Sequence, residues 1–222
     1  MKKFLTSSAA AACIIMVTIS CAGLPVEHAY PMSAPEAVPP PEMPMIPERP
    51  QIPLAIMGHG IISADNLTAF LLSVNAWADY DFVKDLSTYY IEEAALEGVN
   101  SDIAFVQMCL ETGFLQFGNL VTPDMYNFAG LGATGLPGAD GLPERGLHFP
   151  DPRTGVRAHI QHLKAYGSTE PLNQELVNPR FRFVTRGIAP TFAGLTGRWA
   201  TDPLYDQKIS AILERLYEFA YP

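Results

Sequence analysis

The sequence predicts a mainly α-helical single domain with a long loop region, rich in glycine and proline, at its middle. Three observations support this fold class. Apolar residues recur at helical spacing in several segments after residue 61, residues typical of helix ends bound these segments, and no strand-rich pattern or internal repeat competes with them. The composition, with 48% hydrophobic and 17% charged residues, is that of a chain that folds.

Residues 1–20 have the layout of an export signal. Two lysines at positions 2 and 3 precede a small and apolar stretch that is too short to cross a bilayer as a permanent helix. The sequence Ser20-Cys21-Ala22-Gly23 follows and resembles the lipobox of bacterial lipoproteins, although Thr18 stands where the lipobox prefers leucine. This resemblance implies a protein exported to the cell envelope and anchored to a bacterial membrane through a lipid on Cys21. Ordinary cleavage, with Cys21 discarded or left free, is the alternative.

Residues 21–60 are predicted to be a proline-rich linker. Half of the 20 prolines of the chain lie between residues 24 and 53, in a stretch with few charges and no apolar periodicity. Such a stretch should populate extended polyproline II, at roughly 3 Å per residue, and would let a membrane-tethered domain reach a wall at some distance. A binding motif for a proline-recognising partner is the alternative.

The predicted domain spans residues 61–222 and begins with three helices. They run from the N-cap residues at 63–66 through Val74, from about residue 82 to residue 96 before Gly98, and from the caps at 100 and 101 to Gly113. Glycine suits the left-handed conformation that often ends a helix. Residues 120–152, rich in glycine and proline, are then expected to form loops.

Two further helices are expected after this loop region. The first spans residues 154–166, and the second, residues 202–221, has one apolar and one charged face. His159 and His162 flank the apolar stripe of the first of these helices. They could be metal ligands, but no cysteine or carboxylate partner has ligand spacing, so surface or half-packed histidines are expected.

Charge and cysteine content exclude several classes of protein. The formal net charge of −9 argues against nucleic acid as a partner, because binding to phosphates needs clustered lysine and arginine. A polysaccharide ligand suits this composition better. Of the three cysteines, Cys109 alone lies in the predicted domain, so no disulfide forms there, and its apolar neighbours favour a packed thiol over a nucleophile.

Glu111 is the candidate catalytic residue. It is expected in the last turn of the third helix, where the carbonyl end of the dipole disfavours an anion, and Leu110, Phe114 and Phe117 can exclude water from it. Both effects raise the pKa of a carboxyl group. A glutamic acid that stays protonated near neutral pH is what glycosidic cleavage needs, because the leaving sugar oxygen must receive a proton. From the residues alone, a solvent-exposed glutamate is the alternative.

Three motifs lie in order along the predicted domain. They are residues 99–113, which end in Leu-Glu-Thr-Gly, Asn127-Phe128-Ala129-Gly130-Leu131-Gly132, and residues 199–209, which contain Ala-Thr-Asp-Pro. Together they resemble the motifs of the bacterial peptidoglycan glucosaminidase domain family, which is mannosyl-glycoprotein endo-beta-N-acetylglucosaminidase-like and of glycoside hydrolase family 73 type. The resemblance covers residues 61 to about 216 and implies a lysozyme-like helical fold.

The resemblance also implies roles for individual residues. Glu111 matches the catalytic acid of the family, Asn127 and Phe128 match the turn that lines the sugar groove, and Trp199 and Tyr205 fall in the last motif as substrate-binding residues. Trp199 stands where the family commonly has a tyrosine. It can stack on a sugar but offers no hydroxyl, so any role of that phenol must fall to another residue.

The second catalytic group is left open by the sequence. Many relatives carry a second carboxylate on a β-hairpin after the Asn-Phe motif, whereas this chain has a short glycine- and proline-rich segment with Asp140, Glu144 and Asp151. Each of the three is a candidate general base, and for each the alternative is a solvated loop charge. If none reaches the site, the N-acetyl group of the substrate could supply the nucleophile.

Taken together, the resemblance implies a glycoside hydrolase of the endo-β-N-acetylglucosaminidase type. Its expected substrate is the glycan strand of peptidoglycan, cleaved at the β-1,4 bond after N-acetylglucosamine, with no metal and no cofactor. A non-catalytic peptidoglycan-binding lipoprotein is the alternative from another class. A third possibility, lytic transglycosylation, uses one acid and no water.

Overall fold

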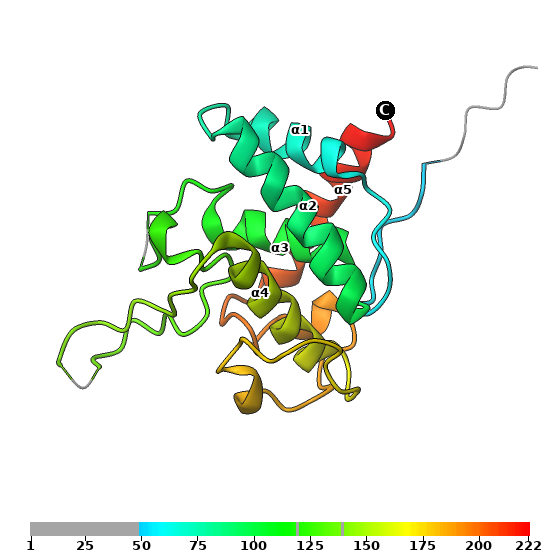
Figure 1. Cartoon of the computed structure of the whole chain (residues 1–222). Helices are drawn as coiled ribbons and strands as arrows, with labels where there is room; N and C mark the ends of the chain where they lie inside the picture. Colours follow the sequence, from blue (N-terminus) through cyan, green and yellow to red (C-terminus); the bar gives the residue numbers. More distant parts are fainter. Residues whose placement is uncertain (1–48, 119, 139) are drawn as a thin grey trace, which may run out of the picture. The chain divides into compact units, whose positions relative to one another are not determined.

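Five α-helices joined by loops make up the domain, which is known from a computed structural model that describes residues 49–118, 120–138 and 140–222 (Figure 1). The helices are α1 Ala64–Val74, α2 Tyr80–Glu97, α3 Ser101–Thr112, α4 Pro152–Gly167 and α5 Tyr205–Ala220, with the short 3₁₀ turns η1 Pro123–Met125, η2 Phe181–Phe183 and η3 Phe192–Leu195. Within these residues, β-pairing is limited to isolated bridges. The predicted mainly α fold with a loop region in its middle is confirmed, and it is consistent with a lysozyme-like domain.

The helix ends follow from local side-chain chemistry. Ser63 and Asn100 cap α1 and α3 by accepting hydrogen bonds from backbone N–H groups of the first turn. Gly98 and Gly113 end α2 and α3 with φ values of 70° and 58°, a backbone region in which a side chain would be strained. The second helix begins two residues before the expected start, because Asp79 caps it by accepting from the N–H of Phe82.

The third helix lies at the centre of the core, in contact with α2, α4 and α5 (Figure 1). Its first nine residues, 101–109, are all buried, and Cys109 is among them, as the prediction of a packed thiol required. Burial on all sides explains why this helix shows no single apolar stripe in the sequence. It also holds the backbone that carries Glu111 in one place.

The packed region begins before residue 61, where the sequence analysis places the start of the domain. Ile56 is fully buried, its N–H donates to the carbonyl of Pro190 over 2.9 Å, and its carbonyl accepts from the N–H of Asn100 over 2.8 Å. Residues 52–60, which the sequence analysis assigns to the linker, therefore lie against the domain. The predicted signal peptide, Cys21 and the linker up to residue 48 lie outside the described residues.

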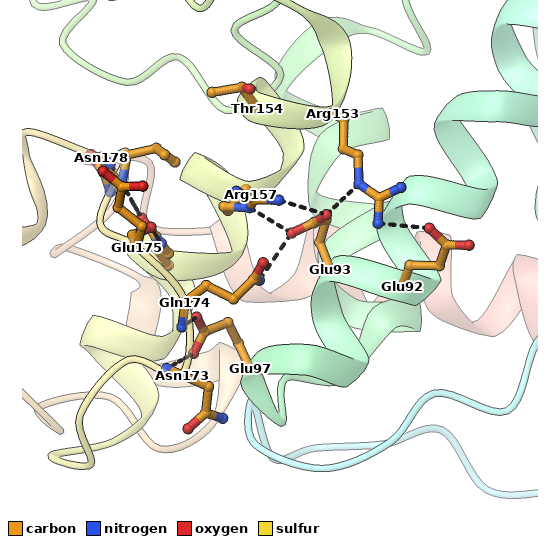
Figure 2. Close-up of polar contacts among 12 residues, drawn as sticks. Glu92, Glu93, Glu97, Arg153, Thr154, Arg157, Asn173, Gln174, Glu175 and Asn178 are labelled. Carbon is orange, nitrogen blue, oxygen red and sulfur yellow. Dashed lines mark hydrogen bonds and ion pairs between the residues drawn. The ribbon is translucent and has the colours of Figure 1, made fainter.

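Buried charges tie α2 to α4 and to the segment that follows α4. Figure 2 shows Arg153 and Arg157 of α4 converging on Glu93 of α2, with N to O distances of 2.6 and 2.8 Å. One turn later, Glu97 accepts from the ammonium group of Lys164 over 2.9 Å in surroundings that exclude water. Because a buried carboxylate is stable only when it is paired and hydrogen-bonded, these contacts set the distance between the two helices.

No helix in residues 49–118, 120–138 and 140–222 is both long enough and apolar enough to span a membrane.

Candidate active site

A cavity of about 260 Å³ opens at the C-terminal end of α3. Its walls come from three parts of the chain, namely the end of α3 with the residues that follow it, the loop around residues 120–133, and residues 199–200 before α5. Glu111, Phe117, Asn127, Gly130 and Trp199 are among the residues that line it. Residues of the second and third motifs therefore line the same cavity as Glu111 of the first motif.

The end of α3 places Glu111 at this cavity. Gly113 adopts the left-handed conformation, and the N–H of Phe114 donates back to the carbonyl of Cys109 over 2.7 Å, which ends the helix at Thr112, one residue after the glutamate. Phe114 and Phe117, like Leu115, have positive φ values, which are uncommon for residues with side chains. The chain thus turns sharply beneath the carboxyl group and brings Phe117 to the same cavity.

Burial raises the pKa of Glu111 above the ordinary value of a glutamic acid. Hydrogen bonding from Tyr205 and Trp199 acts in the opposite direction, because it favours the ionised carboxylate, but the effect of burial is the larger one. The unpaired carbonyl groups at the end of the helix also disfavour a negative charge. The group is therefore biased towards the protonated form at a position where a ligand in the cavity can meet it.

A chain of hydrogen bonds runs from Glu111 into the core. Tyr205 donates from its hydroxyl to Oε1 of Glu111, and the phenol oxygen accepts from Nε2 of Gln107 over 2.8 Å. Oε1 of Gln107 is 2.9 Å from Nε2 of His159, and Nδ1 of His159 is 2.9 Å from the hydroxyl of Tyr90. An amide oxygen only accepts, so Nε2 of His159 carries the proton, Nδ1 accepts, and Tyr90 donates.

Every donor in this chain points towards Glu111. Because the oxygen of Tyr205 already accepts from Gln107, its own proton is directed at Oε1 of Glu111. That leaves Oε2 to carry the proton of the acid. A methyl group built at Gly130, in the wall of the cavity, would lie 3.7 Å from this Oε2 atom, so Oε2 lies close to the wall of the cavity.

The expectation that His159 and His162 lie at the surface or half-packed is wrong. His159 is fully buried between Tyr90 and Gln107, and His162 is buried with its Nδ1 atom 2.9 Å from the amide nitrogen of Asn178. Burial lowers the pKa of His159 to about 3 and that of His162 to about 4, so both rings are neutral at neutral pH. The sequence of α4 alone does not reveal this, because the covering groups come from distant segments.

A metal site has no support in this part of the chain. Residues 49–118, 120–138 and 140–222 hold no group of three or more histidine, cysteine, aspartate or glutamate side chains that could bind a metal ion.

Asn127 lines the cavity, but its side chain is occupied by its own loop. Its amide nitrogen donates to the carbonyl oxygens of Leu131 and Leu147 over 2.9 and 3.0 Å, and its oxygen accepts from the N–H of Leu131 over 2.9 Å. These bonds shape the turn that carries Gly130 to the cavity. Asn127 is therefore a residue that builds the wall of the cavity.

Phe128, expected to hold the sugar, is 1% exposed and packs in the core with Phe82, at a distance of 6.5 Å between ring centroids. Phe128 is not among the residues that line the cavity, although its neighbour Asn127 is. No face of the ring is free for stacking on a sugar. The sequence could not distinguish a core phenylalanine from a binding one, since both are apolar residues in a motif.

Trp199 and Tyr205 both lie at the site, in different ways. Trp199 lines the cavity, and its ring packs against His159 and His162 at centroid distances of 5.6 and 5.0 Å. Tyr205 is 4% exposed, and its hydroxyl is bound to Glu111. Trp199 stands where the family commonly has a tyrosine, so the cavity wall lacks a phenol at this position. Tyr205 does not supply one there, because it does not line the cavity and its hydroxyl is bound to Glu111.

None of the three loop carboxylates lines the Glu111 cavity. Asp151 caps α4 by accepting from the N–H of Thr154 over 2.8 Å, and Asp140 accepts from the N–H of Leu142 over 3.0 Å. Glu144 accepts from the hydroxyl of Thr134 over 2.8 Å. Each carboxylate is therefore used by its own loop, and residues 134–138 and 140–145 project away from the helices (Figure 1).

The sequence analysis missed Gln107, His159 and Tyr90 as supports of the acid. A glutamine inside the apolar run 105–110 was the one available signal, because a buried amide must find partners. The identity of those partners depended on α2 and α4, which the sequence does not place next to α3.

Residues 87–218 match the glucosaminidase family, described as mannosyl-glycoprotein endo-beta-N-acetylglucosaminidase. The chain belongs to this family. The match spans all three motifs and includes Glu111, Trp199 and Tyr205, so family membership supports a glycoside hydrolase that acts on peptidoglycan.

A similar protein is an uncharacterized protein of Borreliella burgdorferi, strain ATCC 35210 / DSM 4680 / CIP 102532 / B31. It is 42% identical over 164 residues, which cover 74% of this chain and 78% of that protein. No solved structure matches the chain.

Proposed function

We propose that this glucosaminidase hydrolyses the β-1,4 bond after N-acetylglucosamine in peptidoglycan, with Glu111 as the proton donor. The observation that supports this proposal most strongly is the half-buried carboxyl group of Glu111, with its raised pKa, in the wall of a cavity. A protonated carboxyl group at a sugar-sized opening is what cleavage of a glycosidic bond requires.

In the proposed reaction, Oε2 of Glu111 donates its proton to the oxygen that links two sugars. The bond from the anomeric carbon to this oxygen breaks, the oxygen leaves as a hydroxyl group, and positive charge develops on the ring. Water finally supplies a hydroxyl group to the anomeric carbon and a proton that restores Glu111. The hydrogen bond from Tyr205 keeps Oε1 occupied, so that Oε2 remains the donor.

The group that attacks the anomeric carbon is proposed to be the N-acetyl oxygen of the substrate. Among the described residues that line the cavity, Glu111 is the one carboxyl group, and Asp140, Glu144 and Asp151 serve their own loops. Substrate assistance needs a single acid on the protein and gives a product with the same anomeric configuration as the substrate. Inversion of this configuration, measured by NMR on fresh product, would contradict this step.

Replacing the acid tests the proposal directly. The Glu111→Gln protein, in which the amide cannot donate an acidic proton, should release soluble fragments from isolated cell walls roughly 10² to 10⁴ times more slowly than wild type. Glu170→Gln, which makes the same change at an exposed position, serves as the control. The products should carry N-acetylglucosamine at their reducing ends in mass spectra. Undiminished release by Glu111→Gln would refute the mechanism, and anhydro-muramic products would indicate lytic transglycosylation.

A non-catalytic wall-binding protein is the second candidate, favoured by the lack of a second carboxylate among the described lining residues. In that case the wild-type protein would sediment with isolated cell walls and release no soluble fragment.

Export and lipid anchoring through Cys21 are also proposed, on the layout of residues 1–23. Mass spectrometry of the mature N-terminus checks this proposal, since a chain that begins elsewhere than Cys21, or carries no acyl group, would contradict it.

A further inference from the structure

A second hollow, of about 210 Å³, adjoins the Glu111 cavity. Both are lined by Ala129, Gly130, Ala133 and Trp199, so they share one wall. A chain-like ligand that occupies the first cavity therefore has a ready continuation into the second. The proposed glycan substrate is such a ligand.

The second hollow is positively charged. Arg180 and Arg198 line it, whereas no aspartate or glutamate does. In a chain with a formal net charge of −9, this is a local reversal of sign. Neither arginine takes part in an ion pair among the described residues, although Arg153 and Arg157 on α4 do.

Both guanidinium groups are held in place by contacts that leave most of their N–H donors available. Nη1 of Arg198 donates to the carbonyl of Gly194 over 3.0 Å, and the guanidinium of Arg180 lies over the ring of Phe183, 5.4 Å from its centroid. A guanidinium group has five N–H donors, so each arginine has several left. A planar fork with free donors fits a carboxylate and holds it by two parallel bonds.

The charges of the two arginines both act on Tyr166, which lines the same hollow. Burial raises the pKa of the Tyr166 hydroxyl, and the charges of Arg180 and Arg198, which line the same hollow, both act in the opposite direction. Tyr166 also lines the hollow, and its hydroxyl donates to the carbonyl of Arg198 over 3.1 Å. His162, at the base of the same hollow, is neutral. The positive charge therefore comes from the arginines alone.

We propose that Arg180 and Arg198 bind a carboxylate on the muramic acid residue next to the bond that is cut. This inference rests on the proposed function. In the alternating strand of peptidoglycan, N-acetylglucosamine is neutral, whereas muramic acid bears a lactyl group that ends in a free carboxylate or in a peptide with carboxylates of its own. Both neighbours of an N-acetylglucosamine residue are muramic acid, so a carboxylate site beside the cavity suits either direction of the strand.

Such a site sets the register of the strand. When a muramic acid residue lies in the arginine hollow, the sugar in the Glu111 cavity is N-acetylglucosamine, and the bond after it meets the acid. A shift by one sugar would put a neutral residue against two unpaired guanidinium groups and lose the charge-assisted hydrogen bonds. The arginines are therefore specificity-determining residues, distinct from the acid that cleaves.

The test compares arginine variants on charged and neutral glycans. The full-length chain is prepared as wild type and with Arg180→Gln, Arg198→Gln and both changes. Arg182→Gln is the control, because Arg182 is exposed and does not line the hollow. The substrates are wall glycan strands with their peptides, the same strands with peptides removed to leave lactyl carboxylates, and a neutral oligomer of N-acetylglucosamine.

We expect kcat/KM on strands that carry carboxylates to fall roughly tenfold for each arginine removed, mainly through KM, as the loss of a charge-assisted hydrogen bond implies. Hydrolysis of the neutral oligomer should change less than twofold. A loss confined to strands with peptides would identify a peptide carboxylate as the ligand, a loss confined to peptide-free strands would identify the lactyl carboxylate, and a loss on both would show that the arginines accept either one. Equal losses on neutral and charged glycans, or no loss on either, would overturn the proposal.

A binding measurement separates this inference from the proposed function. In the Glu111→Gln background, where cleavage is expected to be strongly slowed, the dissociation constant for a soluble, peptide-free muramic acid tetrasaccharide is measured by calorimetry with and without the arginine pair. Roughly 100-fold weaker binding without the arginines supports the carboxylate site even if the wild-type protein cleaves nothing. Unchanged binding of this tetrasaccharide and of its peptide-bearing form refutes the site whatever the enzyme does.

Discussion

Removing His159 should flatten the dependence of stability on pH. The ring is fully buried, and its pKa is lowered from 6.5 to about 3, chiefly by loss of solvent. Below pH 6.5 the unfolded chain therefore binds a proton that the folded chain does not bind, and stability falls as pH falls towards the folded pKa. One such proton changes the free energy of unfolding by about 1.4 kcal/mol per pH unit, or about 4 to 5 kcal/mol over the whole window. This is a large part of the roughly 5 to 15 kcal/mol that stabilises a domain.

The assay is urea denaturation between pH 5 and pH 7 for wild type, His159→Gln and His148→Gln. His148 is exposed, so His148→Gln is the matched control for the loss of a histidine side chain. Between pH 6 and pH 5, the free energy of unfolding of His159→Gln should fall less steeply than that of wild type, by about 1.4 kcal/mol per pH unit. This difference in slope is expected whatever the absolute stability of the variant. His162 acts in the same direction, and the raised carboxyl pKa values of Asp102 and Glu111 act in the opposite one, but these contributions are common to all three proteins. Parallel curves for wild type and His159→Gln would refute a neutral, buried His159.

Two further predictions concern single contacts. Tyr205→Phe removes a hydrogen bond that favours the ionised form of Glu111, so the pKa of Glu111 should rise. The pH above which kcat/KM declines should therefore move upward. A downward or absent shift would contradict the assigned role of the phenol. Lys164→Met leaves Glu97 charged without its ammonium partner in a buried position and should lower the free energy of unfolding by roughly 3 to 5 kcal/mol in urea titrations. Lys84→Met, at an exposed site on α2, should change it by less than about 0.5 kcal/mol, and equal effects at the two lysines would argue against a buried pair.

The helices and the place of the acid were predictable from the sequence. Capping residues such as Ser63 and Asn100 and the glycines at 98 and 113 act over a few residues, so their effect can be read without knowledge of the fold. The position of Glu111 in the last turn of α3 follows from the same local rules. So do its apolar neighbours and part of the reason for its raised pKa.

The surroundings of Glu111 were not predictable in this way. Tyr205 lies 94 residues further along the chain, and His159 lies 52 residues from the glutamine that it contacts. Periodicity places His159 beside an apolar stripe but does not say which other segment covers it. The same limit applies to Phe128, because a side chain in a turn faces the core or a cavity according to what packs against that turn.

By itself, the sequence determined which segments of this glucosaminidase form helices, with their ends placed to within about three residues, and which carboxyl group lies at the end of α3, because hydrogen bonds within one or two turns decide those features. Only the tertiary structure decided that Asp140, Glu144 and Asp151 stay with their own loops, that Gln107 and Tyr205 direct a proton towards Glu111, and that Arg180 and Arg198 share a hollow beside it. These features depend on which distant segments exclude water from one another. The free energy that decides them is that of burial and of pairing polar groups inside the core, and no short stretch of sequence contains both partners.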